Sequence, residues 1–140
     1  MFAPSRDDVR RFFADAWRKH GAHAPILPME TLAVDIVLAH PEYQSLLDSP
    51  EAAMAAEFTV EHGGINPFLH MSLHLAVEEQ LSIDQPRGLK KEFARILACS
   101  GDRHAALHAL LDCLGETVWR AQRDGAPPDS LAYLECVRKR

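Results

Sequence analysis

Signals for the start of a helix recur along this sequence at short intervals. Residues that cap helix N-termini stand at four of these points: Ser49, Asn66, Asp102 and Asp129. A proline follows the first two, and proline fits the first helical turn because the amide hydrogen it lacks would have no partner there. Apolar residues spaced three and four apart follow these signals. The pattern predicts an all-α protein, a helical bundle of roughly four main helices plus short ones.

The expected helices are bounded by these signals and by glycine or proline at their ends. They cover 5–20, 28–39, 41–47, a short stretch after Ser49, 66–81, 89–98, 102–123 and a final short stretch after Asp129. Ser5 is expected to cap the first helix, and HGGI (62–65) is expected to be a loop. The segment LAVDIVL also alternates as a strand would, but its length and short connections favour a buried helix.

Size and composition indicate one folded domain over 1–140. A chain of 140 residues can bury a core unaided, and 47% hydrophobic with 25% charged residues is globular composition. A net charge of -5 argues against nucleic acid as a partner. The sequence has no apolar run of the roughly 18 residues that span a bilayer and no signal peptide at its start, so we expect a cytoplasmic protein without a membrane partner.

The three cysteines are Cys99, Cys113 and Cys136, and they form no CxxC pair. An odd, scattered set suggests neither a disulfide framework nor a thiolate zinc site. We therefore expect all three to be reduced residues on helices.

His70, His74 and Glu78 follow one another at four-residue spacing in the expected helix 66–81. At about 100° per residue, this spacing places them on one continuous stripe. Apolar residues flank the stripe on both sides, so it lies on the face expected to be buried. A buried polar group without a partner costs on the order of a few kcal/mol. These side chains therefore need partners inside the protein.

Two other expected helices carry similar residues. His104, His108 and Asp112 follow the same four-residue spacing in the helix 102–123, with Asp112 at the edge of its apolar arc. Asp35 stands among apolar neighbours in the helix 28–39, and His40 ends that element. A buried lone acid requires a cation or hydrogen-bond donors.

Histidines and acids that project from facing helices are typical of metal-binding bundles. We expect the helices that start at 28, 66 and 102 to face one another around a mononuclear or dinuclear site. The preferred ligands are His70, His74 and His108, with Glu78 as the best carboxylate, and the second choices are His104, Asp35, His40 and Asp112. Imidazole and carboxylate suit zinc, iron, manganese or nickel better than calcium; without such an ion, no cofactor is expected.

Two functional classes stay open. A metal ion with an open coordination position would activate water for hydrolysis or, as iron, bind oxygen or a small ligand, so an enzyme is one reading. The alternative is a non-catalytic interaction protein whose buried histidines form a structural hydrogen-bond network. His20, His23 and His62 are expected in surface loops, outside any site. The sequence names no partner, and a homo-oligomer stays open.

The whole chain resembles one known family. The segments that carry the resemblance are MFAPSRDDVRRFF, LAVDIVLAHPEY, NPFLHMSLHLAVEEQLSIDQP, CLGETVW and AYLECVRKR. They are similar to a bacterial family known as domain of unknown function 1841, and the most specific block contains His70, His74 and Glu78. The resemblance implies a bacterial, cytoplasmic, single-domain protein and brings no activity. By spacing alone, the histidines also resemble those of hemerythrin-like and DinB-like metal bundles, an analogy at the level of fold.

Overall fold

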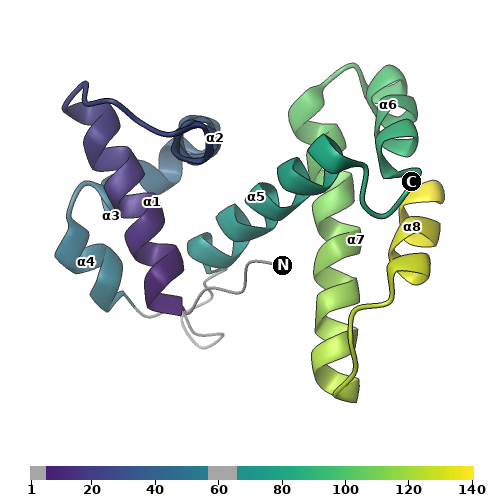
Figure 1. Cartoon of the computed structure of the whole chain (residues 1–140). Coiled ribbons are helices and arrows are strands. Elements are labelled where there is room, and N and C mark those ends of the chain that lie inside the picture. The colour runs from purple at the N-terminus through teal and green to yellow at the C-terminus, as the bar shows by residue number, and fades with distance from the viewer. Residues whose placement is uncertain (1–5, 57–65) are drawn as a thin grey trace. The chain divides into compact units, whose positions relative to one another are not determined.

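The computed structural model describes residues 6–56 and 66–140 (Figure 1). Regular secondary structure in these ranges is helical, with no strand, so the all-α prediction is confirmed. The elements are α1 (Arg6–Gly21), α2 (Pro28–Leu38), the 3₁₀ turn η1 (Pro41–Tyr43), α3 (Gln44–Leu47), α4 (Pro50–Ala55), α5 (Pro67–Ile83), α6 (Leu89–Ser100), α7 (Arg103–Asp124) and α8 (Ser130–Arg138). The chain forms two compact units, one up to Leu75 and one from Ala76 onward, and α5 begins in the first and ends in the second.

The predicted helix caps are confirmed. Ser49 accepts a hydrogen bond from the Ala52 amide, and Asp102 accepts one from the His104 amide. The side chains of Asn66 and Asp129 each accept two amide hydrogen bonds from the first turn of the helix that follows. Such caps satisfy backbone donors that have no partner within the helix. The expected Ser5 cap and the HGGI loop lie outside the described residues.

In the first unit, α1 packs against α2, α3 and α4. The apolar residues of α1 form one stripe at helical spacing, in which Phe13 and Ala16 are buried and Val9, Phe12 and Trp17 pack against the core. The buried apolar residues of this core are Phe13, Ala14, Ala16, Ala33, Val34, Ile36, Val37, Leu47, Ala53, Phe68 and Met71. This core places the end of α2 and the start of α5 in one compact unit.

Arg10 is a charged residue inside this unit, only 1% exposed. Its Nη1 atom donates to the carbonyl oxygens of Ala53, Met54 and Ala56, at 3.0, 3.3 and 2.6 Å. The guanidinium also lies over the Phe68 ring, 4.9 Å from its centroid. The last carbonyls of a helix lack partners within it and carry partial negative charge, so a cation there is stabilising. Arg10 thus fastens the end of α4 to α1.

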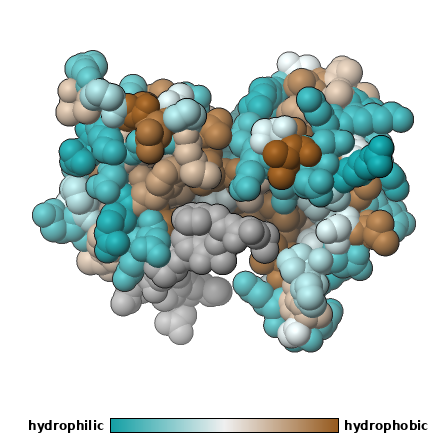
Figure 2. Space-filling view, in the orientation of Figure 1, coloured by the Kyte–Doolittle hydropathy of each residue, from teal (hydrophilic) through white to brown (hydrophobic). Residues whose placement is uncertain are grey.

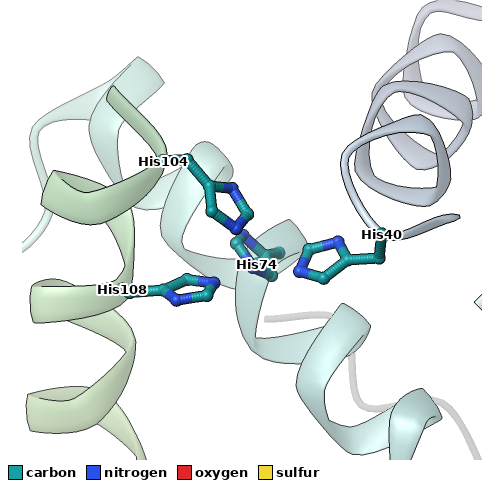
Figure 3. A group of neighbouring side chains, drawn as sticks. All are labelled: His40, His74, His104 and His108. Atoms are coloured by element: carbon teal, nitrogen blue, oxygen red, sulfur yellow. The ribbon is translucent and has the colours of Figure 1, made fainter. Parts of the chain in front are cut away.

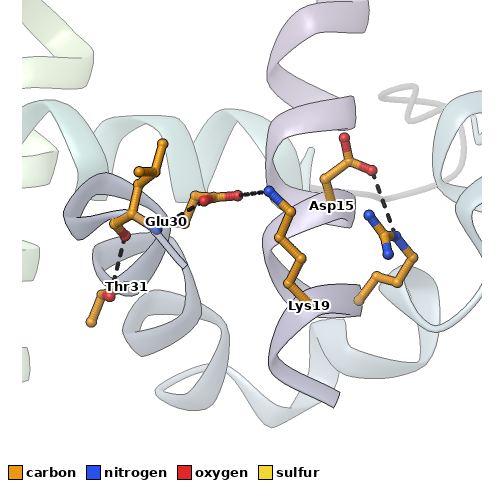
Figure 4. Close-up of polar contacts among 6 residues, drawn as sticks. Asp15, Lys19, Glu30 and Thr31 are labelled. Atoms are coloured by element: carbon orange, nitrogen blue, oxygen red, sulfur yellow. Dashed lines mark hydrogen bonds and ion pairs between the residues drawn. The ribbon is translucent and has the colours of Figure 1, made fainter. Parts of the chain in front are cut away.

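Glu30 joins the first two helices. Its carboxylate accepts from the Leu27 amide at 2.9 Å and pairs with the Lys19 ammonium at 2.9 Å (Figure 4). The hydrogen bond from Lys19, followed by the one from Leu27, lowers the pKa of the Glu30 carboxyl. The start of α2 is therefore held both by its own first turn and by α1.

The segment LAVDIVL is a helix, as predicted, but its expected burial on all sides is wrong. Asp35 is exposed, because only one face of α2 packs in the core and the other meets solvent.

Apolar and polar surfaces intermix on the face drawn in Figure 2. The exposed large apolar residues of the described chain are Leu27, Met29, Leu32, Leu38, Leu69, Ile83, Trp119 and Leu131.

In the second unit, α6, α7 and α8 pack against one another. The buried apolar residues of this unit are Val77, Leu81, Leu89, Phe93, Ile96, Ala106, Leu107, Leu110, Leu111, Cys113, Leu114, Tyr133, Leu134 and Val137. Gly101 and Gly125 end α6 and α7 with φ of 69° and 62°, a left-handed conformation that glycine adopts without steric cost. Among the helices described, none is long and apolar enough to cross a membrane.

The expectation of three reduced cysteines is wrong for two of them. Cys113 in α7 and Cys136 in α8 form a disulfide, with their Cα atoms 5.7 Å apart, whereas Cys99 is exposed and unbridged. The two residues are 23 apart in sequence. Only the packing of α8 on α7 brings them within bonding distance, and spacing along the chain does not reveal that packing.

Candidate metal centre

His40 follows α2 at the turn into η1 and is 3% exposed. Its Nδ1 atom lies 2.7 Å from the carbonyl oxygen of Ile36, one helical turn earlier. A carbonyl oxygen only accepts, so Nδ1 carries the proton, and in the neutral ring Nε2 then presents a lone pair. A backbone carbonyl that holds one ring nitrogen in this way is the usual support of a metal-binding histidine.

His70 and His74 extend the cluster within the first unit. The Nε2 atoms of His40 and His70 lie 3.2 Å apart, and because His40 presents a lone pair there, His70 donates. The ring centroid of His74 lies 4.7 Å from that of His40 and 4.8 Å from that of His70. His74 is itself 2% exposed. The four-residue spacing in α5 thus brings two imidazoles against a third from the end of α2.

Tyr43 borders these imidazoles. Its ring stacks nearly parallel on His40, with centroids 5.2 Å apart and planes 7° apart, and lies edge-on to His70 at 6.2 Å. Burial raises the pKa of the Tyr43 phenol, and the nearby Glu42 charge adds to the shift. The phenol therefore stays protonated at neutral pH, and its ring holds the plane of His40.

In the second unit, His104 and His108 lie one above the other on α7 (Figure 3). Their ring centroids are 4.1 Å apart, with planes inclined at 53°, and both side chains are partly buried. The Asp102 cap fixes the first turn of α7, from which His104 projects. The predicted pairing of these histidines on one helix face is therefore present.

The carboxylates proposed from sequence lie elsewhere. Both oxygens of Glu78 accept from Arg103, at 2.8 and 3.0 Å, and this hydrogen-bonded pairing raises the pKa of the guanidinium. Asp112 is exposed, and its carboxylate lies 3.8 Å from an Arg140 nitrogen. Asp35, also exposed, belongs to the solvent face of α2.

Within the described residues, the first unit brings together His40, His70 and His74, and the second unit brings together His104 and His108. The group in the first unit contains two of the preferred ligands, His70 and His74, and one second choice, His40. The preferred His108 and the second-choice His104 form the pair on α7. The sequence signal for His40 was weak, because no histidine or acid stands four residues before or after it.

The expected surface histidines lie outside this cluster. His20 is exposed and stacks on Trp17 with centroids 5.4 Å apart, and His23 is exposed in the turn after α1. His62 is not among the described residues.

The fold and the site define an all-α protein with histidines clustered on its helices. The chain belongs to the family described as Domain of unknown function (DUF1841), whose family model matches residues 5–139. The family membership indicated by the sequence is therefore confirmed. No curated protein and no solved structure matches the chain.

Proposed function

We propose that the first unit of this protein binds a divalent transition metal ion through ring nitrogens of His40, His70 and His74. The observation that carries the proposal is the hydrogen bond between His40 Nδ1 and the Ile36 carbonyl. It directs the lone pair of Nε2 toward the other imidazoles of the first unit before any ion arrives. Because the hydrogen bond already fixes the orientation of the His40 ring, metal binding does not have to order this side chain.

The spacing inside the first unit suits metal ligation. Two nitrogens that each lie about 2.05 Å from a tetrahedral zinc ion are about 3.3 Å apart. The Nε2 atoms of His40 and His70 are 3.2 Å apart. An ion can therefore take the place of the shared proton with small movements of the rings, so that His40 and His70 both become ligands.

The donor chemistry selects the ion. A ligand set of imidazoles favours zinc, nickel or copper, whereas calcium, magnesium and manganese prefer oxygen. The carboxylate of Glu78 is held by Arg103 and is absent from the set. The three imidazoles of the first unit leave the fourth position of a tetrahedral zinc ion to a further ligand or to water. A water molecule in that position would be activated for hydrolysis.

The test is metal content, measured by elemental mass spectrometry on protein purified without an affinity tag or chelator and then exposed to zinc. We expect about one ion per chain in wild type and none in the His40→Ala/His74→Ala variant. A matched control replaces two exposed histidines, His20→Ala and His23→Asn, where asparagine tolerates the positive φ of position 23.

Folding of each variant is checked by circular dichroism. A folded wild type that stays empty after zinc addition would overturn the proposal. The hydrogen bonds of His40 to Ile36 and of His70 to His40 would then stand as a structural network, and the protein would belong to the non-catalytic interaction class.

A further inference from the structure

We propose that Cys113 and Cys136 are a reversible thiol–disulfide site that controls how firmly α8 docks on α7. The bond joins the middle of α7 to the last turns of α8. Cys113 is completely buried, whereas Cys136 is partly exposed. One sulfur of the bond is thus enclosed by the core, and the other belongs to a residue that solvent reaches.

Helix α8 depends on its docking. It has nine residues, fewer than the roughly 12 to 15 that an isolated helix needs for even marginal stability in water. Its apolar face, which includes Tyr133, Leu134 and Val137, is buried. Because α8 cannot persist as a separate helix, any loss of docking also loosens its backbone hydrogen bonds.

Besides its buried apolar face, α8 has polar attachments that do not involve the disulfide. The Tyr133 hydroxyl donates to Gln80 Oε1 at 2.8 Å, and Arg95 Nη2 donates to the carbonyl oxygens of Val137 and Arg138 at 3.2 and 3.3 Å. These contacts survive reduction of the disulfide. We therefore expect that reduction makes α8 detach from α7 more often but does not unfold it permanently.

The exchange chemistry follows from the unequal burial of the two cysteine residues. A thiolate of a dithiol reductant attacks the sulfur of Cys136, the S–S bond breaks, and Cys113 leaves as a thiolate that takes up a proton. The second thiol of the reductant then attacks the mixed disulfide and releases Cys136 as a thiol. Two electrons pass from the dithiol, which becomes a disulfide, and a disulfide oxidant reverses the reaction.

The consequence depends on the compartment. In a reducing compartment, disulfides are rare, and those that form are usually transient or redox-sensing. In such a compartment, the fraction of the protein with α8 firmly docked would depend on the ratio of disulfides to thiols around the protein. In an oxidising compartment, the same bond would be a permanent staple.

The first measurement counts accessible thiols. After treatment with oxidised glutathione, alkylation of the unfolded protein without reductant should leave Cys113 and Cys136 unmodified, and alkylation after dithiothreitol should modify all three cysteines. Modification of all three without reductant would overturn the proposal, because no bond would have formed between Cys113 and Cys136.

The second measurement is hydrogen exchange of the native chain with and without dithiothreitol. We expect exchange in α8 to rise by roughly tenfold or more on reduction, because the loop that the disulfide closes is opened, while exchange in α1 stays unchanged. The Cys113→Ala/Cys136→Ala variant should show the fast exchange without reductant, and Cys99→Ser should respond as wild type does. Equal exchange of α8 in the oxidised and the fully reduced wild type would overturn the proposal even if the double variant fails to fold.

Discussion

Glu78 and Arg103 form a two-bond ion pair, with oxygen–nitrogen distances of 2.8 and 3.0 Å. Glu78 continues the histidine stripe of α5, and its position one turn after His74 made it the carboxylate most expected to ligate a metal. Both of its oxygens instead point at a guanidinium that projects from the first turn of α7. Glu78 can therefore stabilise the fold through this ion pair or ligate a metal ion, and a single substitution of Glu78 distinguishes the two roles.

A Glu78→Gln variant should keep the metal content of wild type and lose about 1 kcal/mol of unfolding free energy. The loss is small because the Arg103 side chain is half exposed, and such pairs contribute little when solvent screens them. Elemental mass spectrometry and urea unfolding measure the two quantities. Loss of the ion from a folded Glu78→Gln protein would return Glu78 to the ligand set.

A His70→Ala variant should lose zinc affinity by roughly tenfold or more. The ion takes the place of the proton shared by the Nε2 atoms of His40 and His70, so the variant removes one of the three ligands of the first unit. Competition with a chromophoric chelator measures the affinity. A zinc affinity equal to that of wild type would remove His70 from the ligand set.

Local features of this fold could be predicted from sequence. The caps at Asn66 and Asp102 depend only on neighbouring backbone amides, and the structure has both. The stripe of His70 and His74 depends only on helical periodicity, and their rings lie 4.8 Å apart.

Partnerships between distant residues could not be predicted in this way. The exposure of Asp35 results from how much of α2 its neighbours cover, and composition cannot reveal that. The partner of Glu78 is 25 residues away, and that of Cys113 is 23 residues away. In each case the pairing follows from the packing of helices, so a periodic pattern indicates that a partner is needed without identifying it.

An Arg10→Met variant should destabilise the first unit by about 2 to 4 kcal/mol. Methionine keeps most of the apolar stem but leaves the carbonyl oxygens at the end of α4 without their donor, and each buried unsatisfied group costs about 1 to 3 kcal/mol. The matched control is Arg11→Met. The Arg11 side chain is exposed, and its Nη1 atom lies 3.6 Å from the Oδ1 atom of the exposed Asp8. Equal urea midpoints for the two variants would contradict the role assigned to Arg10.

The unfolding free energy that Glu30 contributes should decrease as the pH falls into the acid range. Its folded pKa is lowered from 4.5 by Lys19 and the Leu27 amide, so the folded chain binds this proton less readily than the unfolded chain does. The contribution is therefore complete above pH 4.5 and is lost as the pH falls through the lowered folded value. Unfolding free energies of wild type and Glu30→Gln should differ by a constant amount between pH 6 and 8 and should converge in acid. A difference that stays constant, or grows, below pH 4.5 would mean that the carboxylate is not stabilised by its charge, and the Lys19 pair would then add nothing to the docking of α2 on α1.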